Sequence, residues 1–556
     1  MKRVTAILLS VALVLSMAAC GAQETVTETS AAATEAATQA ATEAVTTPAP
    51  SWQEEHPTWL CEDKATLKLL TYDSVNGSND PPSNDQRFWQ MVEDYTNVHI
   101  DWEIVPYAGY EEVIQARLAA GADLPDIINV YTPANALQAG KNGILVNLAE
   151  YWDECFPCTK AYFAEEGTDY KNLISNGDGS IYSLQGTTEP VEGHITLCYN
   201  TEWMQKLGAE IPKTLDEFTA LLEKMKAAGD LNGNGVDDEI VFTGADMQKL
   251  YSAIGTAFDL EAYLSMEPYA VRDGKNVYDE YTCDNQKAYL TYVNDLYKKG
   301  LIDQEICSMS ASTLSEKCAA DRVGVFAYYT AFAISYGAMT TAGQSDPLGE
   351  HFTLGYPLAS SYNNNEAYFT RREVVSSSLS TAVTENSENK ELAMRWLDAV
   401  FGSKDLVTLR TCGVEGEHFT ANADGTKTLI APADGSTWSG VEGGNQLTIA
   451  FIQTKEQLLN TKQEYPWYLA EYDVLRDTIK WKSPTIVHVV GYSDEEQEKV
   501  DLYNTDIKTY YAEARDGFVK GDLDIEKDWD RYVSTMEQLG VKEMVSVWQS
   551  VYDRTK

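Results

Sequence analysis

Basic residues are scarce in this 556-residue chain, which has 42 lysines and arginines against 85 aspartates and glutamates. The formal net charge at pH 7 is -43. So acidic a surface repels the phosphates of nucleic acids and of anionic lipids. Nucleic acid is therefore excluded as a partner, and polyanionic ligands are disfavoured unless a local basic pocket overrides the overall charge.

Long apolar runs are also missing after the first twenty residues. A membrane-spanning helix needs about 20 consecutive apolar residues, and the chain beyond Met17 contains no such run. The body from about Ser51 to Lys556 has instead an ample supply of aliphatic and aromatic residues. It is too long for one hydrophobic core, because chains divide into domains above about 250–300 residues. We expect a globular body of two lobes or more that does not span the bilayer.

Common catalytic motifs are absent as well. The sequence contains no G-x-S-x-G, no H-E-x-x-H and no P-loop, and its six histidines form no set with metal-ligand spacing. We therefore do not expect an enzyme. A cell-surface glycoside hydrolase is the alternative. It needs two carboxylates facing each other across a sugar, and with so many acidic residues candidate pairs carry no information.

Cysteines are few, and their spacing fixes no disulfide pattern. Besides Cys20 there are eight, an even number that permits disulfides in an exported chain. Cys155 and Cys158 form a C-x-x-C pair, but it does not follow a strand, and no second pair completes a zinc site. We expect a local disulfide or two free thiols here.

The N-terminus has the pattern of an export signal. Two cations at Lys2 and Arg3 precede an apolar run, Val4–Met17, and small residues precede Cys20. The arrangement resembles the bacterial lipobox, in which the cysteine is diacylated and becomes the new N-terminus, although Met17 stands where leucine is usual. We expect residues 1–19 to be a signal peptide and Cys20 to carry lipid. The alternative is an ordinary signal peptide with an incidental cysteine.

A low-complexity segment follows the cysteine. Residues 20–62 begin with Ala/Thr/Glu repeats that end in Thr47-Pro48-Ala49-Pro50, and no lysine or arginine occurs between Gly21 and Asp63. Such a composition cannot bury enough apolar surface to offset the entropy of ordering. We expect a disordered tether between the lipid and the body, and hence a protein held on the extracellular face of the cell membrane.

Strand and helix patterns alternate in the first part of the body. Strand patterns occur at 65–72, 99–105 and 124–131, and amphipathic helix patterns at 87–96 and 110–120. This alternation predicts an α/β fold with a mostly parallel sheet.

The next predicted helix has a strong start signal. Thr214 and Glu217 form a capping box for a helix that runs to about Ala228. Trp203 and Trp396 lie on amphipathic helix patterns and are expected in the core.

The sharpest internal motif is the segment 230–239, DLNGNGVDDE. Side-chain oxygens recur at positions 1, 3 and 5, a glycine stands at 6 and Asp238 at 9, which is the spacing of an EF-hand-like calcium loop. Val241 replaces the usual glutamate at position 12, and Glu239 at position 10 can take its role. The alternative is a polar turn without metal. The pattern favours calcium. Because no second loop of this kind occurs, we expect a structural site and not a switch.

Several segments together are similar to one known family. They are GADLPDI at 121–127, GILVNL at 143–148, YNTEWMQKLG at 199–208, PKTLDEF at 212–218 and QSVYDR at 549–554. Each is weak alone, but their order and spacing resemble the extracellular solute-binding proteins of family 1, the receptor lipoproteins of sugar ABC importers. The alginate-oligosaccharide-binding members carry a calcium loop of this form at this place.

The resemblance implies a periplasmic-binding-protein-like fold of two α/β lobes joined by a hinge, with each lobe discontinuous in sequence. One lobe is expected to hold 63–194 and 357–401, and the other 195–356 and 402–556. A monomer is expected to capture an oligosaccharide and deliver it to ABC permease subunits, with a peptide or another small solute as the alternative ligand. The implied calcium ligands are Asp230, Asn232, Asn234, the carbonyl of Val236, Asp238 and Glu239.

Sugar contacts are expected from aromatic and polar side chains near the carboxyl ends of strands. Sugars present apolar C–H faces that stack on aromatic rings and hydroxyls that need polar partners. Ligand loops of open α/β sheets lie at the carboxyl ends of strands, and further aromatic residues stand in loops. The candidate ligand residues are Tyr72, Asp73, Tyr131, Tyr328, Tyr329, Arg371, Trp438 and Trp467.

Overall fold

The computed structural model describes residues 51–73, 81–187, 194–261, 269–271, 274–340, 349–370, 375–423, 427–430, 448–453, 465–482 and 492–554. The predicted signal peptide, Cys20 and most of the tether lie outside these residues. The chain forms two compact units, Met1–Pro57 and Thr58–Lys556. In the first unit the described part contains one short helix, α2 (Ser51–Glu55).

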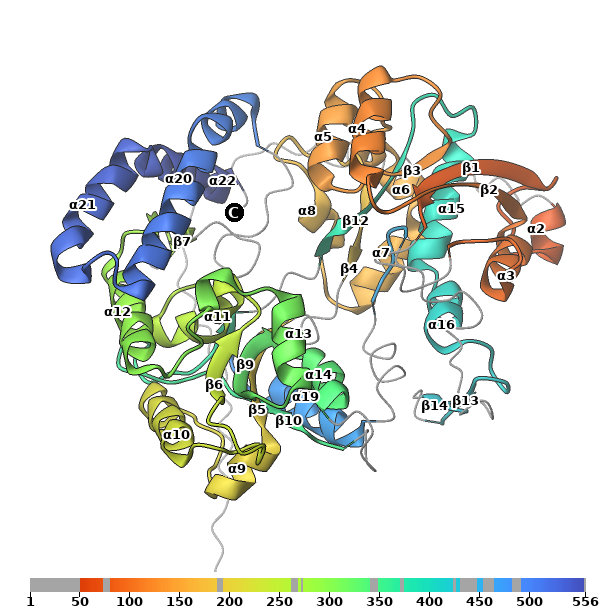
Figure 1. Cartoon of the computed structure of the whole chain (residues 1–556). Coiled ribbons are helices and arrows are strands. Elements are labelled where there is room, and N and C mark those ends of the chain that lie inside the picture. Colours follow the sequence, from red (N-terminus) through yellow and green to blue (C-terminus); the bar gives the residue numbers. More distant parts are fainter. Residues whose placement is uncertain are drawn as a thin grey trace, which may run out of the picture. The chain divides into compact units, whose positions relative to one another are not determined.

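The second unit contains two main sheets, and the first has five strands in the order β2-β1-β3-β12-β4 (Figure 1). β1 pairs in parallel with β2 and β3, whereas β12 runs antiparallel to β3 and β4. The sheet is therefore mixed and parallel only in its first three strands. The strands are β1 (Ala65–Tyr72), β2 (Val98–Val105), β3 (Ile127–Asn129), β4 (Leu184–Thr187) and β12 (Val375–Val383).

Side-chain alternation along β1 and β3 divides the core of this sheet into two clusters. Leu69 and Ile127 face the cluster that holds Trp396, and Leu70 and Ile128 face the cluster on the other side. The predicted bounds of β1, α3 and α4 are confirmed. Helices and small strands associated with this part are α3 (Arg87–Thr96), α4 (Tyr110–Ala120), α5 (Pro133–Lys141), α6 (Trp152–Cys155), α7 (Pro157–Glu165), α8 (Tyr170–Ile174), α15 (Lys390–Gly402), α16 (Lys404–Cys412), β13 (Phe419–Ala421) and β14 (Lys427–Leu429).

The second sheet has four strands in the order β10-β5-β9-β6. Only β6 and β9 pair in parallel, and β5 runs antiparallel to both β9 and β10. The prediction of a mostly parallel sheet is wrong here, because alternation of strands and helices does not reveal which strands become neighbours. The strands are β5 (Ile195–Asn200), β6 (Ile240–Gly244), β9 (Val323–Tyr329) and β10 (Phe352–Leu354).

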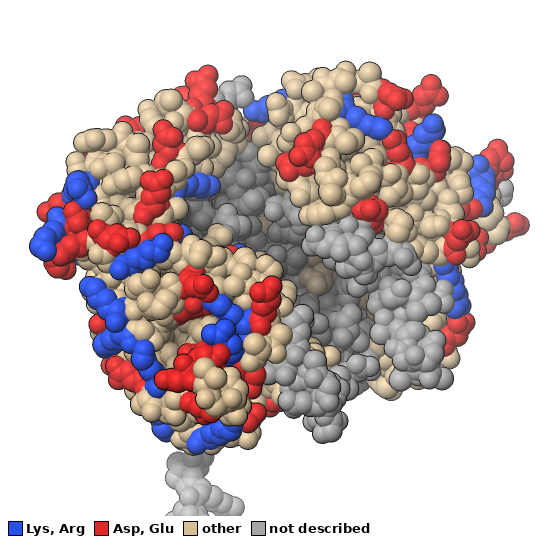
Figure 2. All heavy atoms as spheres, viewed as in Figure 1, with Lys and Arg blue, Asp and Glu red and all other residues tan. Residues whose placement is uncertain are grey.

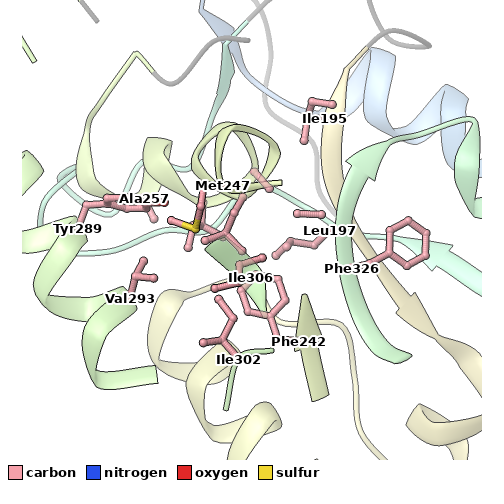
Figure 3. Close-up of a cluster of buried hydrophobic side chains, with 14 of the residues drawn as sticks. Ile195, Leu197, Phe242, Met247, Ala257, Tyr289, Val293, Ile302, Ile306 and Phe326 are labelled. Atoms are coloured by element: carbon pink, nitrogen blue, oxygen red, sulfur yellow. The ribbon is translucent and has the colours of Figure 1, made fainter. Parts of the chain in front are cut away.

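One large core joins this sheet to its helices (Figure 3). Trp203 is fully buried in it, as the sequence predicts. The capping box is confirmed, because the Thr214 hydroxyl accepts the Glu217 N–H at 3.2 Å and the Glu217 carboxylate accepts the Thr214 N–H at 3.1 Å. The remaining elements are α9 (Thr201–Leu207), α10 (Leu215–Ala228), α11 (Met247–Ile254), β7 (Tyr269–Val271), β8 (Val277–Asp279), α12 (Asp284–Lys299), α13 (Ala311–Ala319), α14 (Phe332–Thr340), β11 (Phe369–Thr370), α19 (Pro466–Thr478), β15 (Trp481–Lys482), α20 (Asp494–Lys520), α21 (Ile525–Gln538) and α22 (Val541–Arg554).

Two segments pack differently from the expected lobe boundaries. Leu406 and Val407 of α16, together with Ile452, lie in the core of the first sheet, although the sequence assigned 402–556 to the second lobe. Leu358 and Phe369 lie in the core of the second sheet, although 357–401 was assigned to the first. α16 follows α15 without a long connection and packs against it and against α3, so it stays with the first core. The other boundaries remain predictions.

The described cysteines are all free thiols. Burial and the nearby Asp398 carboxylate raise the pKa of Cys158 to about 12, whereas redox thiols have lowered pKa values. The C-x-x-C pair therefore shows no sign of redox activation. No helix among the described residues is long and apolar enough to cross a membrane.

Candidate functional site

The loop between α10 and β6 adopts a chain of tight turns in which side-chain oxygens bind backbone amides. Asp230 Oδ2 accepts the N–H of Gly235 at 2.9 Å, Asn232 Oδ1 accepts that of Asn234 at 2.9 Å, and Asn234 Oδ1 accepts that of Val236 at 2.7 Å. Gly235 has a φ of +84°, which glycine adopts without steric cost. The side-chain oxygens of Asp230, Asn232 and Asn234 thus accept backbone N–H groups within the loop, and their role as metal ligands remains a prediction.

Asp238 and Glu239 use their carboxylates for protein contacts. Asp238 forms an ion pair with Arg322, whose Nε lies 2.8 Å from Asp238 Oδ2. The Oδ1 atom of Asp238 accepts a hydrogen bond from the side-chain amide of Asn234 at 3.0 Å. Glu239 Oε1 accepts the N–H of Leu231 at 2.7 Å. Within the described ranges, no group of three or more His, Cys, Asp or Glu side chains lies close enough to hold a metal ion.

The loop fits a hard cation in its donor chemistry, but its carboxylates are not gathered around one point. All six predicted donors are oxygen atoms, which Ca²⁺ prefers, and the turns at positions 1, 3 and 5 are formed. Asp238 and Glu239 do not converge with Asp230 in this structure, because Arg322 and backbone N–H groups hold them. They would have to exchange these partners for the ion.

Four tyrosines gather at the carboxyl ends of the parallel strands of the first sheet. The ring of Tyr107 lies 5.2 Å from that of Tyr72 and 6.3 Å from that of Tyr131, and the Tyr107 and Tyr131 hydroxyls are 3.4 Å apart. Tyr110 lies 5.1 Å from Tyr72 and 6.3 Å from Tyr131. We call Tyr72, Tyr107, Tyr110 and Tyr131 the first aromatic cluster. Its outer members, Tyr107 and Tyr131, are only half-buried.

Tyr131 is held in an unusual conformation. Its φ is +68°, a left-handed value that is uncommon outside glycine and that persists only when the surroundings impose it. Asn129 imposes it in part, since its Oδ1 accepts the Tyr131 N–H at 2.8 Å. Strain of this kind concentrates at functional positions.

The structure differs from the sequence prediction at Tyr72 and adds Tyr107. The Tyr72 side chain is 1% exposed, so it packs in the core and offers no ring face to a ligand. Asp73 accepts the Tyr107 N–H at 2.8 Å and holds the turn after β2. Tyr107 follows the end of β2 by two residues, and the strand-end rule used for Tyr131 would also have selected it.

A second group of rings, which we call the second aromatic cluster, lies where β9 ends. The Tyr328 ring lies 5.1 Å from that of Tyr329, 4.3 Å from that of Phe332 and 6.1 Å from that of Tyr336. Tyr328 is 9% exposed, and Tyr329 and Phe332 are half-buried. The sequence predicted the two tyrosines but not Phe332, which begins α14.

Trp467, another predicted ligand residue, is not part of either cluster. Trp467 lies in the first turn of α19, half-buried against the core of the second sheet, with its ring 5.9 Å from that of Tyr468. Arg371 and Trp438 lie outside the described residues.

Comparisons with known proteins place the chain in a family. The model of the bacterial extracellular solute-binding proteins matches residues 80–405, more than half of the chain. FusA, the fructooligosaccharide ABC transporter substrate-binding protein of Streptococcus pneumoniae serotype 4, is 25% identical over 542 residues, which cover 92% of this chain and 94% of FusA.

Two solved structures share the fold. The alginate-binding protein AlgQ2 without calcium ion has a TM-score of 0.65 at 19% identity, covering 89% of this chain and 99% of AlgQ2. An EF-hand mutant of S. pneumoniae FusA in complex with fructo-nystose has a TM-score of 0.63 at 22% identity, covering 88% of this chain and 99% of that protein. The fold is thus that of two-lobe periplasmic solute-binding proteins, and this chain belongs to the bacterial extracellular solute-binding proteins.

Proposed function

We propose that this protein captures an oligosaccharide outside the cell membrane and delivers it to the permease of an ABC importer. The observation that carries the proposal is the pair of aromatic clusters, one at the strand ends of each main sheet. Half-buried tyrosines suit the C–H faces of sugars, and their hydroxyls suit sugar hydroxyls. FusA, which matches nearly the full length of this chain, is by its name a fructooligosaccharide-binding protein.

Ligand capture in this account proceeds by closure of the two lobes. A ligand that contacts both lobes stabilises the closed arrangement only to the extent that it binds that arrangement better than the open one. Tyr107 and Tyr131 would contribute from one lobe, and Tyr329 and Phe332 from the other. Arg371, Trp438 and Trp467 remain predicted contacts.

The experiment that tests this function is a thermal-shift screen of the purified body, from which the signal and tether have been removed, against oligosaccharides and peptides. Binding to the folded protein raises the melting temperature. An oligosaccharide that raises it, with no cleavage products after long incubation, supports the receptor. Stabilisation by peptides alone would favour the alternative ligand class, and cleavage products would favour the glycoside hydrolase.

We also propose that the loop 230–239 binds one structural Ca²⁺. The residues that would hold it are Asp230, Asn232, Asn234, the carbonyl of Val236, Asp238 and Glu239. The formed turns and the all-oxygen donor set support the ion. Two solved relatives add support: AlgQ2 was determined without calcium ion, and FusA was determined as an EF-hand mutant. The ion would neutralise the carboxylates and fix the connection between α10 and β6.

We further propose that Cys20 carries the lipid anchor. The signal-like residues 1–19 and the Ala/Thr/Glu tether support this placement, because a receptor must stay within reach of its permease. Replacement of Cys20 by serine should release the protein from the membrane fraction into the medium. Retention of the Cys20→Ser protein on the membrane would contradict the anchor.

A further inference from the structure

The charges around the two aromatic clusters bear on which oligosaccharides can bind. A glycan built from uronic acids carries one carboxylate per ring and needs cations, or free helix N-termini, where it binds. A neutral glycan needs neither. The charged groups near each cluster therefore distinguish the two classes of ligand.

The first aromatic cluster lies beside a helix N-terminus that carries its own negative charge. α4 begins at Tyr110, a member of the cluster, and Glu111 and Glu112 occupy its first turn with exposed side chains. A bare N-terminus attracts anions, but carboxylates in the first turn already satisfy its positive end. Among the described residues, no lysine or arginine pairs with Glu111 or Glu112.

One ring of the first cluster, that of Tyr131, lies close enough to these carboxylates for its pKa to be affected. The hydrogen bond with Tyr107 and burial, together with the charges of Glu111 and Glu112, raise the pKa of Tyr131 to about 12. The cation beside this cluster, Arg117, is already paired with Glu103. A carboxylate on a ligand stacked at Tyr131 would thus meet repulsion without a free partner among the described groups.

The second aromatic cluster also lies beside the capped N-terminus of a helix, but here a lysine pairs with the carboxylate. β6 and β9 are in register at Gly244 and Ala327, so Asp246 and Tyr328 lie at the same edge of the sheet. Asp246 caps the N-terminus of α11 by accepting the Lys249 N–H at 2.8 Å. The Lys249 ammonium lies 3.0 Å from the Asp246 carboxylate, so this cation is also used within the protein.

We propose that the ligand is a neutral oligosaccharide, that Glu111 and Glu112 exclude oligouronates from the first aromatic cluster, and that the Asp246–Lys249 pair leaves oligouronates no free cation at the second. The inference rests on the proposed function, and it agrees with the overall charge: acidic side chains are spread over the surface that Figure 2 shows. The two cations described beside the clusters, Arg117 and Lys249, are paired with Glu103 and Asp246.

The test compares calorimetric affinities for neutral fructo-, malto-, xylo- and galacto-oligosaccharides with those for oligogalacturonates and alginate oligomers. Oligogalacturonates and their fully methyl-esterified forms share the same rings and linkages and differ in the charge at C6, which makes them a matched pair. We expect a neutral oligosaccharide to bind and every oligouronate to bind at least about tenfold more weakly. An oligouronate that binds as tightly as the best neutral glycan would overturn the inference and leave the proposed function standing.

A charge variant makes the test specific to the named residues. Glu111→Gln combined with Glu112→Gln should reduce the ratio of the affinity for the neutral glycan to that for the uronate by about threefold. Glu498→Gln combined with Glu513→Gln, which removes two exposed charges from α20, is the control and should leave this ratio unchanged. An unchanged ratio in the first variant would overturn the role of these glutamates. If no glycan binds and peptides do, the proposed function fails, and this inference fails with it.

Discussion

The guanidinium of Arg322 binds Asp238 twice: its Nε lies 2.8 Å from the carboxylate and also donates to the Asp238 carbonyl at 3.2 Å. Arg322 immediately precedes β9, and its own carbonyl accepts the N–H of Ile240 at 2.7 Å. The arginine therefore ties the last part of the loop 230–239 to the second sheet. It supplies the positive charge next to a carboxylate that the proposed Ca²⁺ would also use.

Replacing Arg322 by glutamine should destabilise the metal-free protein and enlarge the stabilisation by calcium. Without the guanidinium, Asp238 has no cation until Ca²⁺ binds, so the melting temperature in EDTA should fall while that in calcium stays closer to the parent value. Differential scanning calorimetry in EDTA and in calcium measures both. Arg531→Gln, which removes a surface ion pair from α21, is the control. Equal calcium shifts in parent and R322Q would argue against competition for Asp238.

Asp230→Asn should weaken calcium binding without disturbing the metal-free loop. The asparagine oxygen can still accept the Gly235 N–H, but one of three carboxylates is lost, and Ca²⁺ affinity depends on ligand charge. We expect the calcium-induced rise in melting temperature to shrink strongly. Asp237→Asn is the control: it also removes one negative charge from the loop, but at an exposed residue that is not a predicted ligand. This variant should show the same calcium-induced rise in melting temperature as the parent protein. Equal losses in both variants would mean that only the loop's total charge matters.

Tyr131→Ala should weaken binding of the preferred oligosaccharide by about tenfold. An aromatic stacking partner contributes roughly 0.5–1.5 kcal/mol beyond its buried area, and 1.4 kcal/mol corresponds to about a factor of ten. Titration calorimetry measures the loss. Tyr151→Ala, which removes a ring that is 37% exposed, should have no effect. A Tyr131→Ala protein with parent affinity would remove the first aromatic cluster from the binding site.

Glu471 should make the stability of the protein depend on pH. Burial between α19 and β10 raises its pKa to about 7, and its carboxylate accepts the N–H of Leu354 at 2.9 Å. Because the folded state holds the proton more tightly than the unfolded state, the stabilisation is fully present below the unfolded pKa. It is lost as pH rises through the folded pKa, that is, between about pH 4.5 and 7.

Glu471→Gln should remove most of this pH dependence. For a pKa shift of this size, the free energy of unfolding changes by roughly 3 kcal/mol at most. The amide can accept the same N–H and carries no charge to bury. Melting temperatures from pH 4 to 8 give the comparison, with Glu210→Gln at an exposed position as the control. Parallel pH profiles for parent and E471Q would contradict the assignment.

Local features of the fold could be predicted from the sequence, since their causes are local. The alternation in 65–72 defines β1, and the motif Thr214 to Glu217 defines the start of α10. Strand direction could not be predicted in the same way. β12 follows β4 by nearly 200 residues and β3 by roughly 250, and no local pattern within 375–383 predicts that it runs antiparallel to them.

The candidate site was predictable to a similar degree. The spacing of 230–239 predicted the turns of this loop, because each turn depends on residues two to five positions apart; the calcium site stays a prediction. The pairing of Asp238 with Arg322 joins residues 84 positions apart and has no local signal. Tyr72 was misjudged because a strand end alone does not tell whether a ring is covered, and here Tyr107 and Tyr110 cover it.

Isothermal titration of the metal-loaded protein with neutral oligosaccharides, followed by product analysis of the same samples, tests the central claim most directly. The account predicts saturable binding of one neutral oligosaccharide at one site per chain, weakened by Tyr131→Ala, with the sugar recovered intact. Saturable binding of peptides in place of sugars, or recovery of shortened sugars, would contradict it.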